Sequence, residues 1–125
     1  MDAAEFTQQA KEDPQLNAFL TEIAEEAGER ISIEEPTHYT VTGVDILIAL
    51  AAYALYRFLK DYFDKRRALN EVEILKKEEE VIAALIEDGF YPKDAQAVTV
   101  SLLENIAKRS TDDPVFKKAV GLLGQ

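Results

Sequence analysis

The sequence predicts an all-α fold, a compact bundle of five or six helices around a central apolar helix at about residues 44–67. Three observations favour this fold. The stretch from Val44 to Leu59 contains only two charged residues, Asp45 and Arg57, and no Gly or Pro. The segments on either side repeat apolar residues every three or four positions, which is the period of an α-helix packed on one face. Helix-capping residues separate these segments.

Length and composition indicate a globular protein. The 125 residues suit a single domain, residues 1–125, with a core of its own. The chain has no Cys, which excludes disulfides and thiolate metal sites and fits a reducing compartment. Its first residues lack the basic and apolar regions of a secretory signal. We therefore expect a cytoplasmic protein.

The net charge of −10, from 24 acidic and 14 basic residues, bears on the partners. Nucleic acids and anionic membrane surfaces carry the same sign and are disfavoured as partners. A basic protein surface is compatible with this charge.

Two helices are expected before the central one. The first covers residues 2–12, and the second begins at Asp13-Pro14, where Asp can cap the helix and Pro suits its first position. The second helix should end near Ala27, because Gly28 is a natural C-terminal stop. The apolar faces of the two helices are Ala3, Phe6 and Ala10, and then Leu16, Phe19, Leu20, Ile23 and Ala27.

Residues 29–42 show no helical pattern. Residues 30–34 alternate briefly between polar and apolar, and 39–42 are rich in strand-forming residues, with Pro36 between them. The segment forms either a short β-hairpin or an irregular linker, and we favour the linker because a two-stranded ribbon alone is marginally stable.

The central helix has two apolar faces. Its core face carries the residues Ile48, Ala52, Leu55, Leu59 and Tyr62. The opposite face is polar at Arg57, Lys60 and Asp64 but apolar one turn earlier. Since a helix that is apolar all round is buried, we expect the first half of the helix to be covered on every side. The candidate interaction face is therefore Ile46, Ala49, Leu50 and Tyr53.

Three further helices follow. Residues 44–88 could form one helix or two, and we favour a break or kink near Asn70, because a single helix of this length would be long for an isolated domain. Gly89 ends the helix over 71–88. The next helix starts at Pro92, and the last starts at Asp113-Pro114. The expected buried residues of the 71–88 helix are Val72, Leu75, Ile82, Leu85 and Ile86, and those of the helix after Pro92 are Ala95, Val98, Leu102, Leu103 and Ile106.

The residues show no catalytic, metal or nucleotide motif. His38 is the only histidine, and its nearby carboxylates lack the spacing of a metal site. The five glycines are scattered and form no phosphate-binding loop. We therefore expect no enzymatic activity, no cofactor, no metal and no small-molecule substrate.

Three functions remain open. The leading hypothesis is a non-enzymatic protein–protein interaction or assembly module, which self-associates or binds a protein partner. The alternative is a membrane-associated component anchored through the apolar stretch 41–59, although Asp45 and Arg57 are costly at membrane depth. A further alternative is an acidic inhibitor or mimic that binds a basic groove.

Overall fold

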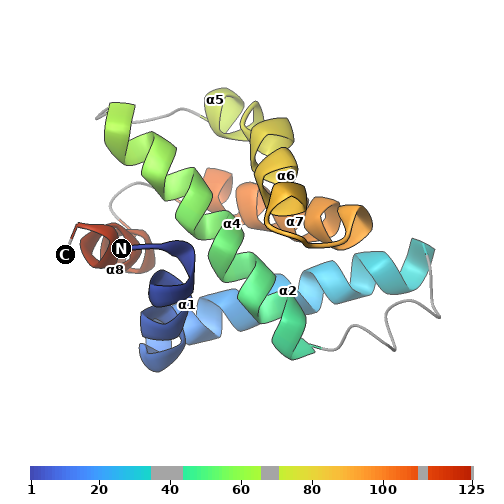
Figure 1. Ribbon diagram of the computed structural model, residues 1–125, viewed down its shortest axis with the longest axis horizontal. Helices are drawn as coiled ribbons and strands as arrows, with labels where there is room; N and C mark the ends of the chain where they lie inside the picture. The colour runs from blue at the N-terminus through green and yellow to red at the C-terminus, as the bar shows by residue number, and fades with distance from the viewer. Residues whose placement is uncertain (35–43, 66–70, 110–112, 125) are drawn as a thin grey trace.

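The computed structural model describes residues 1–34, 44–65, 71–109 and 113–124, and these form a helical bundle without strands (Figure 1). Six of the described helices have ten residues or more, and α5 has five, so the predicted all-α bundle is confirmed. The helices are α1 (Ala3–Glu12), α2 (Pro14–Glu34), α4 (Val44–Lys65), α5 (Glu71–Leu75), α6 (Glu78–Glu87), α7 (Pro92–Lys108) and α8 (Pro114–Leu123).

Helix α4 is the central element of the bundle, as predicted. It crosses the front of the molecule in Figure 1 and packs against α1, α2, α6, α7 and α8. Its inward side chains supply much of one hydrophobic core, and Leu47, Leu50 and Leu59 have no exposed surface. Of its predicted core face, Ile48 is only half-buried.

The Asp-Pro start of α2 is confirmed. The Oδ1 atom of Asp13 accepts hydrogen bonds from the backbone N–H of Gln15 at 3.0 Å and of Leu16 at 3.1 Å. Its other oxygen accepts from Lys118 of α8 at 3.2 Å. The bond from Leu16 is the largest cause that holds the pKa of Asp13 below its usual value, and Lys118 adds to it.

The Asp-Pro start of α8 uses the same capping chemistry. Asp113 accepts a hydrogen bond from the N–H of Val115 at 2.9 Å and pairs with Arg109 at 3.0 Å. Desolvation opposes ionisation of Asp113, but the bond from Val115 and the charge of Arg109 outweigh it. The pKa of Asp113 is therefore lowered. The first turn of α8 and the contact of α8 with the start of α2 therefore both involve ionised carboxylates, those of Asp113 and Asp13.

The predicted end of the second helix at Gly28 is wrong. Helix α2 passes through Gly28 and continues to Glu34, so its last part replaces the start of the predicted hairpin or linker. Tertiary contacts explain this: Ile31 is buried in the core, and Arg30 pairs with Glu104 of α7 at 2.8 Å. These contacts outweigh the roughly 1 kcal/mol that Gly costs inside a helix.

The predicted single helix over 71–88 is also wrong. It is divided into α5 and α6 by a turn at Lys76 and Lys77. In this turn the Nζ atom of Lys77 lies 2.6 Å from Asp61 of α4, and the Lys77 side chain is only 14% exposed. The turn thus directs the Lys77 cation toward the central helix. The local sequence pattern, which is that of a regular helix, does not indicate this turn.

The buried face of this segment differs from the predicted one. Val72, Leu75 and Ile86 were expected in the core and are exposed. Ile74, Val81 and Leu85 are buried, with the spacing i, i+7 and i+11 that puts them on one face of a helix, and Ile82 is half-buried. In contrast, the five predicted core residues of α7 are all buried.

Several predictions lie outside the described residues. They are the rest of the hairpin or linker at 35–42, the lone His38, the break near Asn70 and the last two residues of the predicted central helix, 66–67.

Candidate interaction surface

The candidate face on the first half of α4 is divided by the fold. Leu50 is fully buried and belongs to the core. Ile46, one turn earlier, is 51% exposed, and Ala49 and Tyr53 are half-buried. Within the described chain Ile46 is thus only half covered, so the further cover predicted for this half of the helix has to come from another molecule. The three outer residues are spaced at i, i+3 and i+7, so they form one line along the helix.

The connection between α6 and α7 supports one end of this line. The Phe90 ring packs edge-on against Tyr53, with ring centroids 5.2 Å apart and planes at 79°. One turn further along α4, Arg57 donates to Asp88 at 2.9 Å. Figure 1 shows the end of α6 and this connection beside the middle of α4. The connection is thus attached to the central helix by an aromatic pair and an ion pair.

Gly89 sets the position of Phe90. Its φ of 101° lies in the left-handed region, which a side chain disfavours, and it ends α6 as predicted. The N–H of Phe90 bonds to the carbonyl of Leu85 at 3.1 Å, and that of Gly89 bonds to Ile86 at 3.0 Å. This pair of bonds is the Schellman arrangement, in which the residue after the Gly turns back toward the helix.

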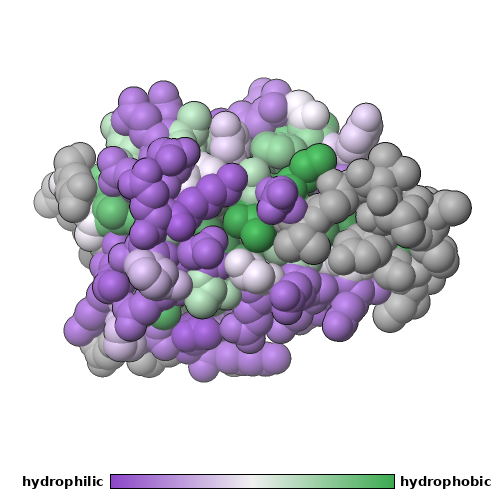
Figure 2. All heavy atoms as spheres, turned by 90° about the horizontal axis from the view of Figure 1, so that it is seen from below, coloured by the Kyte–Doolittle hydropathy of each residue, from purple (hydrophilic) through white to green (hydrophobic). Residues whose placement is uncertain are grey.

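We name Ile46, Ala49, Tyr53 and Phe90 the α4–turn surface. Exposed apolar side chains continue it along the chain, since Ile86 and Tyr91 on either side of Gly89 are also exposed. Figure 2 views the molecule from the end where α4 begins, and it shows apolar side chains near the middle of a mainly hydrophilic face. Sequence reasoning missed Phe90, whose contact with Tyr53 joins residues far apart in the chain.

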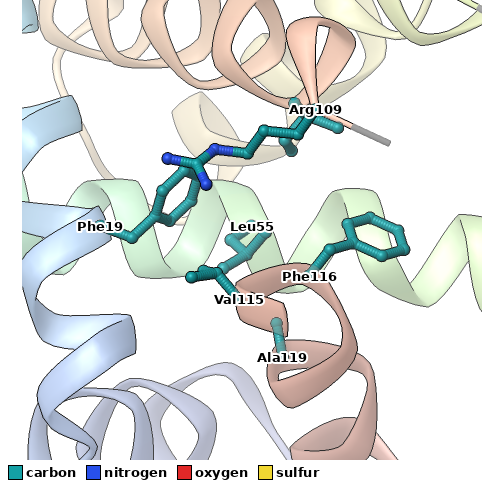
Figure 3. A pocket seen from close by; sticks show the side chains of 7 residues that line it. Phe19, Leu55, Arg109, Val115, Phe116 and Ala119 are labelled. Carbon is teal, nitrogen blue, oxygen red and sulfur yellow. The ribbon is translucent and has the colours of Figure 1, made fainter. Parts of the chain in front are cut away.

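An apolar crevice lies beneath α8 (Figure 3). Only about 10 Å³ of it is open to a water-sized sphere, which is about the space of one water molecule, and Arg109 is the only charged residue among the described residues that line it. The Arg109 guanidinium lies 4.9 Å from the centroid of the Phe19 ring and is paired with Asp113. Its charge is therefore already compensated. The other lining residues are Leu55, Ile106, Val115, Phe116 and Ala119.

A polar crevice separates α4 from α6. It contains Arg57, Asp61, Lys77 and Glu80, with charges of both signs. Besides its contact with Asp61, Lys77 Nζ lies 3.6 Å from Glu80. These groups hold α6 against α4 through ion pairs.

Within residues 1–34, 44–65, 71–109 and 113–124, no three metal-ligating side chains form a group that could hold an ion. In the same described part of the chain, no helix combines the length and the apolar character needed to cross a bilayer. No protein-family model, no curated protein and no solved structure matches this chain.

Proposed function

We propose that this protein is a non-enzymatic interaction module that binds a protein partner through the α4–turn surface. The observation that carries the proposal is the exposure of Ile46, which is 51% accessible, one turn before the fully buried Leu50. Ile46 lies in line with the half-buried Ala49 and Tyr53, and a contiguous exposed apolar patch, unlike a single exposed side chain, marks an interaction site.

The neighbouring aromatic residues support this function. Tyr53 and Phe90 are half-buried and held against each other, so their exposed edges have fixed positions in the free protein. Aromatic residues are enriched at the centres of protein interfaces. A surface that is already ordered loses little conformational entropy on binding.

A matched pair of variants tests the proposal. Ile46→Asp places a charge on the surface, and Val72→Asp makes the same change at a residue of α5 that is 60% exposed. Both positions lie in the first turn of their helices, where Asp is favourable, so we expect both variants to fold. Circular dichroism and urea unfolding will check this.

The binding experiment compares three tagged proteins in an extract of the source cells. A partner of the α4–turn surface is retained by the wild type and by Val72→Asp and is lost with Ile46→Asp. The protein found in this way is then purified and titrated against all three, and Ile46→Asp should weaken its binding by at least about tenfold. Light scattering shows whether the partner is a second copy. If binding and mass are the same for all three proteins, this function is wrong.

A further inference from the structure

The side of α4 that carries the α4–turn surface continues beyond Tyr53 into a basic end. Between residues 46 and 60 of α4, every residue that is not buried lies on this side, apart from Ile48. These residues follow one another in steps of three or four, which is the spacing along which two packed helices touch. They are Ile46, Ala49, Tyr53, Arg57 and Lys60, and we name them the α4 line.

We propose that a second copy of α4 packs antiparallel on the α4 line, so that the protein forms a symmetric dimer. This inference rests on the proposed function, because it names the partner of the same surface. Helix α4 lies at the front of the molecule in Figure 1, and no other described helix crosses in front of it. Its outer side is therefore accessible to another helix along several turns.

The charge changes sign along the α4 line. Asp45, in the first turn of α4, is exposed, and the other end carries Arg57 and the exposed Lys60. A partner helix must therefore place a basic group beside Asp45 and an acidic group beside Lys60. A second, antiparallel copy does both, because a two-fold axis brings the acidic end of each copy to the basic end of the other. A helix that is basic at both ends satisfies only Asp45.

The shapes of the side chains give the same pairing. Ala49 carries only a methyl group and Tyr53 carries a ring, so two antiparallel copies approach most closely when Ala49 of each faces Tyr53 of the other. Asp45 lies four residues before Ala49, and Arg57 lies four residues after Tyr53. Asp45 of each copy then faces Arg57 of the other and lies within one turn of Lys60. One register thus satisfies both the apolar and the charged contacts.

The aromatic residues fall at the centre of this arrangement. In this register the two-fold axis passes between Ala49 and Tyr53, and the Phe90 ring packs against Tyr53 with centroids 5.2 Å apart. The aromatic rings of both copies therefore meet near the axis, where interface residues contribute most to affinity. The net charge of −10 on each copy opposes association at long range, so we expect a weak, transient dimer.

A concentration series tests the dimer. The average mass of the wild type from light scattering should rise with concentration from that of a monomer toward that of a dimer. Amide shifts in NMR spectra should change over the same range at residues 45–60 and 90–91. Ile46→Asp should remain a monomer, whereas Val72→Asp should associate like the wild type.

Two charge variants test the antiparallel pairing. In a dimer of Asp45→Lys, or of Lys60→Glu, like charges meet at both ends, so the dissociation constant should rise by about tenfold. In a dimer of one chain of each, opposite charges meet at both ends. An equal mixture of the two variants should therefore associate like the wild type, a rescue that loss of folding cannot give. Glu22→Lys, at an exposed residue of α2, is the control and should dimerise normally.

The two proposals fail in different ways. If the wild type remains a monomer at the concentrations of NMR spectra, or if the mixture does not restore association, the dimer is wrong. The proposed function still stands in that case if Ile46→Asp loses a different protein that Val72→Asp retains. If Ile46→Asp and Val72→Asp behave like the wild type in every assay, the surface has no partner and both proposals are wrong.

Discussion

Two residues one turn apart on α4 should respond very differently to the same truncation. Leu50 has no exposed surface, whereas Ile46 is 51% exposed. Replacing Leu50 with Ala removes three buried carbon atoms, which is worth about 2.4 kcal/mol at about 0.8 kcal/mol per CH₂. The cavity left behind adds to this loss. We expect Leu50→Ala to lower the free energy of unfolding by about 3 kcal/mol.

Ile46→Ala removes the same number of carbon atoms from a half-exposed position. About half of the transfer term is lost, no enclosed cavity forms, and Ala gains a few tenths of a kcal/mol in helix propensity. The net cost should be about 1 kcal/mol or less. Because the chain has no Trp, unfolding in urea is followed by circular dichroism. The expected fall in melting temperature is roughly 12 °C for Leu50→Ala and 4 °C or less for Ile46→Ala. Equal losses would refute the division of this face into core and surface.

Three other predictions concern stability. Gly89→Ala should destabilise the protein by about 1 kcal/mol because of its positive φ, while Gly121→Ala, whose added Cβ meets no atom within 4 Å, should stabilise it by about 0.5 kcal/mol; equal signs would contradict this. Thr99→Val removes a buried hydroxyl that has no hydrogen-bond partner among the described residues, so the free energy of unfolding should stay constant or rise by about 1 kcal/mol, and a clear loss would show that the hydroxyl is bonded. The carboxyl groups of Asp13 and Asp113, whose pKa values are lowered in the fold, stabilise it above their usual pKa of 3.8 and lose this contribution as the pH falls through the folded values. In Asp13→Asn/Asp113→Asn, whose Asn side chains still cap the helices, the unfolding free energy should therefore fall less steeply below about pH 4 than in the wild type, and parallel pH curves would refute the role of these ion pairs.

The helices whose pattern is uninterrupted were predictable from the sequence. In α7 every residue of the predicted stripe is buried, because a period of three to four residues identifies one face wherever the backbone stays regular. The starts of α2 and α8 were predictable because Asp-Pro acts through atoms within three residues. Both signals are local, so neither depends on the rest of the fold.

The features that depend on distant partners were not predictable. Helix α2 continues past Gly28 because Ile31 and Arg30 meet residues of other helices. The turn between α5 and α6 brings Lys77 to Asp61. The local sequence predicts a helix end at Gly28 and a regular helix at Lys77. Tertiary contacts give the opposite result at both positions.

The candidate face shows the same division between local and distant information. Periodicity correctly placed Ile46, Ala49 and Tyr53 on one side of α4, but it also assigned Leu50 to that side. Leu50 is one turn from Ile46 and only about 40° around the helix from it, yet neighbouring helices cover Leu50 completely and leave Ile46 half exposed. Which of two adjacent positions is covered depends on where the other helices cross α4, and the sequence of α4 does not contain that information.

The turn at Gly89 determines what the α4–turn surface contains. It directs Phe90 onto Tyr53 rather than away from the bundle. In α6, the same helical period that buries Leu85 leaves Ile86 exposed. Phe90 and Tyr53 come from distant parts of the chain, so a partner that recognises this surface recognises a feature of the tertiary fold.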